Sequence, residues 1–210
     1  VPDMRPDVRT QIQRANLQVC NVTTPAQLFH LLRRQIHREF RKPLVLASPK
    51  YLLRLRECVS ALEEFGPDAK FHRVLMESHP RVLERDAAKI RKLVFCVGKL
   101  YFELAKKREE LQAFDVALVR VEQVCPFPFD RVAEAVKRHP NAQLVWAQEE
   151  PQNVGAWLYA DDRVFSATRV LLGEGRRCDL VARRSSASPA EGFGQVHQVV
   201  QEELVRRALS

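Results

Sequence analysis

The sequence contains 210 residues, of which 46% are hydrophobic and 29% are charged, and its formal net charge is +8. This length accommodates one large domain, or one medium domain with an appendage, and the composition is that of a globular rather than a disordered protein. No apolar run approaches the ~20 residues of a membrane-spanning helix, and the basic residues are spread along the chain without a nucleic-acid-binding motif, so neither a membrane nor a nucleic acid is a predicted partner.

The first predicted folding unit covers residues 15–50. Before it, residues 1–14 are polar and contain prolines, which predicts a surface arm; the Val-Pro-Asp start has neither an initiator methionine nor a secretory segment and resembles a cut end. A short strand is expected at Leu17–Val22. A helix should follow, because Thr24 can cap its first turn and Pro25 suits its first position.

Four apolar residues of this helix fall on one stripe, which is typical of an amphipathic helix with a buried face: Phe29, Leu32, Ile36 and Phe40. Pro43 ends the helix, and Leu44–Ala47 reads as a buried strand. The helical crossover makes the two strands of this β-α-β unit parallel.

Residues 51–91 are predicted to be a linker that crosses a surface between two units. A short helix is expected near Tyr51–Arg56 and an edge strand at Phe71–Met76.

Residues 92–210 form the second predicted unit, in which strands and helices alternate. Strands are expected at Leu93–Val97, Val116–Val121, Leu144–Ala147 and, at an edge, Cys178–Ala182. Helices are expected at Leu100–Leu111, from Asp130 to His139, at Ala156–Phe165, and after Gly194 with Val196, Val200 and Leu204 turned inward. Such alternation predicts an α/β fold with a doubly wound, mostly parallel sheet.

Acidic and amide residues follow two of the buried strands directly. Because the carboxyl ends of parallel strands meet at one edge, we expect Glu122, Gln123, Glu149 and Glu150 to line a common rim of the sheet. Glu149 and Glu150 are the candidates for acid/base chemistry, but adjacent residues of a strand point to opposite faces, which favours a rim or interface role. Arg120 needs a partner, and Glu122 projects to the same face.

Three further patterns each leave two interpretations open. Ser48, Lys50 and Arg54, at a strand end, either bind an anion or form a solvated helix start. Gly98-Lys99 is either a phosphate turn or a tight turn into a helix. The six histidines are interpreted as surface or capping residues rather than metal ligands. The five cysteines are widely spaced and lack a C-x-x-C pair, which favours a reducing compartment, the cytosol or the mitochondrial matrix, over a disulfide framework or a zinc site.

Six blocks of the sequence carry a resemblance that extends from about Asn16 to Leu209. They are Thr23–Gln35, Phe40–Leu44, Ser48–Lys50, Gly98–Tyr101, Arg120–Gln123 with Pro126–Pro128, and Gln148–Trp157. In this order and spacing they resemble the C-terminal part of the 2-oxoglutarate dehydrogenase family, the thiamine-diphosphate-dependent decarboxylating subunits, which includes the related 2-oxoadipate dehydrogenases.

The resemblance implies that residues 15–50 are the tail of a pyrimidine-binding domain and that residues 92–210 are a transketolase C-terminal-like domain. The whole enzyme would decarboxylate 2-oxoglutarate on thiamine diphosphate and Mg, and would pass a succinyl group to lipoyl. Its implied partners are a second copy in a homodimer and the succinyltransferase and lipoamide dehydrogenase components. Its implied location is the mitochondrial matrix in a eukaryote and the cytoplasm in a bacterium.

The same resemblance implies that the catalytic motifs lie outside this chain. The sequence has no Gly-Asp-Gly followed by an Asn for the magnesium diphosphate. We therefore expect no catalytic, metal or cofactor-binding residue here, and a domain or dimer interface at Arg120, Glu122, Gln123, Glu149, Glu150 and Asn153. Some relatives bind an acyl-CoA effector, for which Ser48, Lys50 and Arg54 are the candidates.

Two classes of function therefore remain open. The chain is either a non-catalytic portion of a dehydrogenase subunit or a free-standing interaction module derived from that domain. A portion of a subunit should expose a large apolar patch where its missing neighbours pack. The sequence does not separate 2-oxoglutarate from 2-oxoadipate as the substrate.

Overall fold

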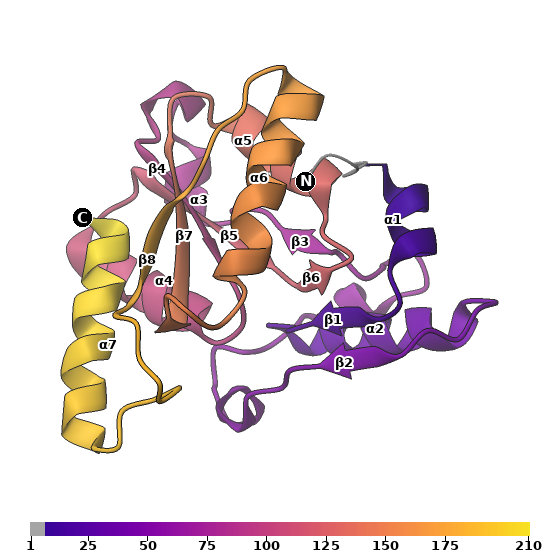
Figure 1. Cartoon of the computed structure of the whole chain (residues 1–210), viewed down its shortest axis with the longest axis horizontal. Coiled ribbons are helices and arrows are strands. Elements are labelled where there is room, and N and C mark those ends of the chain that lie inside the picture. Colours follow the sequence, from indigo (N-terminus) through magenta and orange to yellow (C-terminus); the bar gives the residue numbers. More distant parts are fainter. Residues whose placement is uncertain (1–6) are drawn as a thin grey trace.

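The computed structural model describes residues 7–210, which fold around two sheets (Figure 1). The larger sheet has five strands in the order β3-β5-β4-β7-β8, and the smaller has three in the order β2-β1-β6. The larger sheet contains β3 (Val74–Leu75), β4 (Lys92–Cys96), β5 (Val116–Val121), β7 (Gln143–Pro151) and β8 (Asp179–Arg183). All its neighbouring pairs are parallel except β3 with β5.

Helices cover both faces of the larger sheet, which confirms the doubly wound α/β prediction. One face packs against α5 (Phe129–Arg138) and α6 (Trp157–Leu172), around the buried rings of Phe95 and Trp146. The other face packs against α4 (Leu100–Leu111) and α7 (Gly194–Leu209). Because both faces are covered, the central strands consist almost entirely of apolar residues.

Several predicted elements of this unit differ in extent from the structure. The strand β7 continues beyond Ala147 to Pro151, and α6 continues beyond Phe165 to Leu172. In α7, Leu204 is buried as predicted, but Val196 is 48% exposed, because the first turns of this helix extend past the sheet.

The smaller sheet begins with the predicted β-α-β unit, which consists of β1 (Gln18–Cys20), α2 (Pro25–His37) and β2 (Leu44–Leu46). The two strands are parallel, and the Thr24 hydroxyl accepts a hydrogen bond from the Gln27 backbone N–H at the start of α2, as the sequence indicated. The third strand, β6 (Gln123–Cys125), was not predicted; it pairs antiparallel with β1.

Two expectations about which side chains of this unit are buried are wrong. The helix α2 ends at His37, before Phe40, and it buries Ala26, Gln27, His30 and Leu31, whereas Phe29, Leu32 and Ile36 of the predicted stripe are exposed. The strand β2 is an edge strand with Val45 half exposed rather than a buried one. On the outer side of α2, the Phe29 ring lies 5.7 Å from the Phe65 ring, centroid to centroid, whereas Leu32 and Ile36 remain exposed.

The remaining segments are short. Part of the predicted surface arm is a short helix, α1 (Val8–Arg14). The Asp7 side chain caps it by accepting a hydrogen bond from the Thr10 backbone N–H. The rest of the predicted arm lies outside the described residues. Between the two units lie η1 (Lys50–Leu53), η2 (Leu62–Phe65), α3 (Pro80–Leu83) and η3 (Ala87–Lys89), with β3 at the predicted edge of the larger sheet. Within residues 7–210, no helix is long and apolar enough to cross a membrane.

Candidate functional site

The two sheets meet where β5 ends and β6 begins. The chain leaves the larger sheet at Glu122, and its next residues join the smaller sheet beside β1. The backbone N–H of Asn21 donates to the Glu122 carbonyl oxygen at 2.9 Å. The predicted rim residues Glu122 and Gln123 therefore lie inside a contact between two parts of the chain rather than on an open edge.

Glu122 is fully buried at this contact. Its carboxylate accepts hydrogen bonds from the Thr23 backbone N–H at 2.9 Å and from the Thr23 hydroxyl at 2.5 Å. The Thr23 hydroxyl accepts one from Arg120 Nη1 at 3.0 Å, so Thr23 links the two charged groups. Burial raises the pKa of Glu122 to about 7, although the bonds from Thr23 and the charge of Arg120 oppose the rise.

Gln123 connects the same contact to a basic pocket. Its side-chain N–H donates to the Pro126 carbonyl at 2.8 Å, which directs its Oε1 toward Arg34 Nη2, also at 2.8 Å. The same Nη2 donates to Gln18 Oε1 at 3.0 Å, and Arg38 Nη1 donates to that oxygen at 2.6 Å. Two guanidinium groups thus converge on one neutral amide oxygen.

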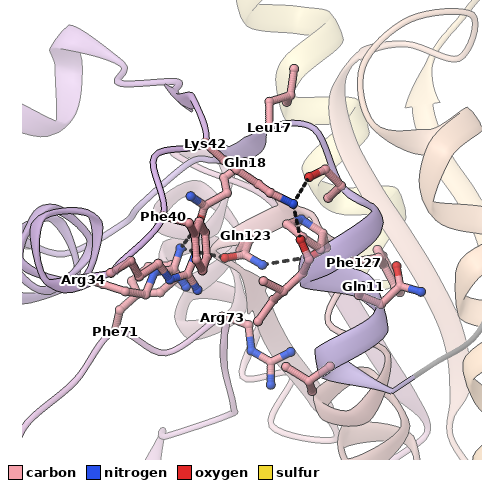
Figure 2. A pocket seen from close by; sticks show the side chains of 15 residues that line it. Gln11, Leu17, Gln18, Arg34, Phe40, Lys42, Phe71, Arg73, Gln123 and Phe127 are labelled. Carbon is pink, nitrogen blue, oxygen red and sulfur yellow. Dashed lines mark hydrogen bonds between the residues drawn. The ribbon is translucent and has the colours of Figure 1, made fainter.

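The pocket has a volume of about 220 Å³ and is shown in Figure 2. Arg34, Phe40, Phe71 and Gln123 lie on one side and Gln11 and Phe127 on the other. Among residues 7–210, its lining includes four cationic side chains and no acidic one: Arg34, Arg38, Lys42 and Arg73. Burial lowers the pKa of Arg34 to about 10, and the nearby charges of Arg38 and Arg73 lower it further.

Glu149 belongs to a separate ionic cluster, beyond the end of β4. Its carboxylate lies 2.5 Å from Lys99 Nζ and 3.7 Å from Arg183 Nη2. Arg183 is buried and also pairs with Glu191. This pairing favours the tight-turn interpretation of Gly98-Lys99, because the ammonium group of Lys99 is already engaged by carboxylates.

The remaining predicted site residues do not join either cluster. Glu150 is exposed, opposite to Glu149, and Asn153 forms two hydrogen bonds with the backbone of Ser186 in a neighbouring loop. Ser48, Lys50 and Arg54 are exposed around η1 and do not line the basic pocket.

The histidine, cysteine and acidic side chains of the described residues are dispersed. Within residues 7–210, no three His, Cys, Asp or Glu side chains are grouped so that they could hold a metal ion. Cys20 and Cys96 are buried, and burial raises the pKa of each thiol to about 12, so neither is a reactive thiolate near neutral pH.

Sequence reasoning missed Thr23 and the residues of the basic pocket. Gln18 lies in β1, Arg34 and Arg38 lie within and directly after α2, and Arg73 precedes β3; of these, only the basic residues of α2 gave a signal in the sequence.

Comparisons with known proteins agree with this architecture. The family model described as "2-oxoglutarate dehydrogenase C-terminal" matches residues 59–209, and that described as "Transketolase, pyrimidine binding domain" matches residues 10–56. Among solved structures, a chain described as a split gene transketolase, inactive beta4 tetramer, has a TM-score of 0.55 at 12% identity and is aligned over 92% of this chain and 58% of its own; this likeness concerns the fold alone.

Curated relatives are more similar in sequence. The chain is 42% identical over 212 residues to a mitochondrial 2-oxoglutarate dehydrogenase of Dictyostelium discoideum, covering 100% of this chain and 20% of the relative. It is 42% identical to a 2-oxoglutarate dehydrogenase E1 component of Cupriavidus necator and 43% identical to a 2-oxoadipate dehydrogenase complex component E1 of Xenopus laevis, in both cases over 93% of this chain and 20% of the relative. The chain thus spans about a fifth of these relatives, and it belongs to the 2-oxoglutarate dehydrogenase family, whose C-terminal region it matches.

Proposed function

We propose that this chain is the C-terminal portion of a thiamine-diphosphate-dependent 2-oxo acid dehydrogenase subunit. The complete subunit would decarboxylate 2-oxoglutarate and transfer the succinyl group to lipoyl, with the succinyltransferase and lipoamide dehydrogenase components as partners. It would act as a homodimer, in the mitochondrial matrix of a eukaryote or in bacterial cytoplasm. This segment would not carry the chemistry; it would support the cofactor-binding domains and the dimer.

The observation that carries the proposal is the set of exposed apolar side chains on α2 and on the edge strand β2. Ile36 is 73% exposed and Leu32 46%, and Val45 on the edge strand β2 is 50% exposed. The β2 strand has a neighbour on one side only. Exposed apolar side chains and an unpaired strand edge are both features of interaction surfaces. The pyrimidine-binding match at residues 10–56 supports further elements of that domain as its occupant.

The contacts of the predicted rim residues support a structural rather than a catalytic role for this segment. Thr23 forms a buried hydrogen bond with Glu122 and a partly buried one with Arg120, and Gln123 forms a partly buried one with Arg34. These bonds hold the pyrimidine-type unit against the transketolase C-terminal-like domain. The interface residues would thus keep the neighbouring domain in register.

The first test is the length and activity of the native polypeptide. A blot of cell extract with an antibody against this chain should reveal a band several times heavier than 24.2 kDa. The purified native subunit should decarboxylate 2-oxoglutarate with thiamine diphosphate and Mg, and the isolated chain should not. A band at the chain's own mass would favour a free-standing module, and a preference for 2-oxoadipate would reassign the substrate.

A pair of variants tests the apolar face itself. In the native subunit, Ile36→Asp should reduce dimer formation and activity together, because a charge would be buried against the docked domain. Val199→Asp is the matched control, since Val199 is comparably exposed, at 68%, on α7. Equal effects of the two substitutions would contradict a specific role for the α2 face.

A further inference from the structure

Contacts within the described chain account for two of the four cationic side chains in the basic pocket shown in Figure 2. Arg73 is paired with Asp130, whose two oxygens lie 3.0 and 2.7 Å from its Nη1 and Nη2. Lys42 Nζ donates to the carbonyl oxygens of Ile12, Gln13 and Ala15 at the end of α1, which is a structural use of the ammonium group. Arg34 and Arg38 remain.

The hydrogen-bond partners of these two arginines in the described part of the chain include neutral amide oxygens. Within residues 7–210, no carboxylate forms an ion pair with Arg34 or Arg38, and their shared acceptor is the neutral Gln18 oxygen. The Nε of Arg34 is buried without a hydrogen-bond partner among the same residues. A buried guanidinium ordinarily has a carboxylate or phosphate partner, because desolvation of an unpaired charge is costly.

The side chains around the two arginines hold them in place. Gln18 Nε2 donates to Gln35 Oε1 at 2.9 Å, which turns the Gln18 oxygen toward both guanidinium groups. The guanidinium of Arg34 lies over the Phe71 ring, 4.3 Å from its centroid, and that of Arg38 lies over Phe40 at 5.1 Å. The two cations are thus pre-positioned for an incoming oxyanion, which lowers the entropic cost of binding.

The rest of the lining selects the kind of anion. Leu17, Phe40, Phe71 and Phe127 give the cavity a substantial apolar surface, whereas a bare inorganic ion prefers polar contacts on all sides. A guanidinium binds a planar carboxylate through two parallel N–H donors. The combination suits a carboxylate carried on a compact apolar body.

We propose that Arg34 and Arg38 form a binding site for a small apolar carboxylate in the cavity between α1, α2 and the start of β6. The carboxylate accepts hydrogen bonds from the two guanidinium groups, either in place of the Gln18 oxygen or beside it. Its apolar part lies against Phe40, Phe71 and Phe127. This site is separate from the exposed Ser48, Lys50 and Arg54, which lie beyond the other end of β2.

The test is a titration of the intact native polypeptide with benzoate, in which calorimetry measures the heat of binding. Binding should be saturable, and benzyl alcohol, which has the same ring without the charge, should not bind. Arg38→Gln should weaken benzoate binding at least about tenfold, because hydrogen bonds to a charged group are lost. Arg34→Lys keeps the charge but removes the planar pair of donors, and it should also weaken binding.

Controls decide between this site and general charge attraction. Arg56→Gln removes an exposed cation that does not line the pocket and should leave the affinity unchanged. Circular dichroism of each variant verifies folding, and Arg38→Gln covers the case in which the more buried Arg34 does not tolerate replacement. The proposal is overturned if benzoate does not saturate, if both pocket variants bind it as the wild type does, or if inorganic phosphate binds more tightly than benzoate.

Discussion

Replacing Arg108 by methionine would leave the carboxylate of Glu77 buried without its cation. Arg108 is 1% exposed on α4 and Glu77 8% exposed after β3, and their closest oxygen and nitrogen lie 2.5 Å apart. The carboxylate also accepts hydrogen bonds from the backbone N–H groups of Leu118, Ser78 and His79 at 2.7, 2.9 and 2.8 Å. This pair therefore connects the edge of the larger sheet to the helix that covers it.

Removing one partner of a buried ion pair costs ~3–5 kcal/mol. The three backbone donors still solvate the carboxylate, so we expect the lower end, about 3 kcal/mol. At the ~2–4 °C per kcal/mol typical of a chain of this size, the melting temperature should fall by about 6–12 °C. Urea unfolding at neutral pH measures the free energy of unfolding directly.

The matched control is Arg138→Met. Arg138 pairs with Glu134 on the surface of α5, where its side chain is 52% exposed. A surface pair of this kind contributes ~0–1 kcal/mol. If Arg108→Met costs no more than this control, burial does not make the Glu77 pair strong and the reasoning is refuted. A double-mutant cycle with Glu77→Gln would separate the pair energy from lost packing of the Arg108 side chain.

Two further predictions concern the contact between the sheets. Burial raises the pKa of Glu122 from 4.5 to about 7, so the folded chain retains a proton that the unfolded chain releases, and the free energy of unfolding should decrease as pH rises from 4.5 to about 7. Glu122→Gln should remove this slope in urea titrations at several pH values, and an unchanged slope would assign it to another group. Gly98 has φ +65°, and a Cβ there would lie 2.4 Å from Asn21 Nδ2, so Gly98→Ala should cost ~1–3 kcal/mol in calorimetry. Gly192→Ala, whose Cβ meets nothing within 4 Å, should be nearly neutral, and equal losses would contradict the clash.

The sequence by itself determined the elements whose signals are local. The helix Leu100–Leu111 and the strand Val116–Val121 have the predicted bounds, because a Gly-Lys turn and continuous apolar runs mark them without reference to distant residues. Thr24 and Pro25 likewise fixed the start of α2. The alternation of such elements was sufficient for a doubly wound sheet, since parallel strands need helical crossovers on its faces.

Only the tertiary structure decided which faces meet. The apolar stripe of α2 has the same periodicity whether a partner covers it or not, so the sequence could not show that Leu32 and Ile36 face outward. Likewise, β6 is a strand because β1, about a hundred residues earlier, offers a free edge to it. The contact of Arg34 with Gln123, and of Glu122 with Thr23, depends on that same pairing, because it brings together side chains that no local spacing relates.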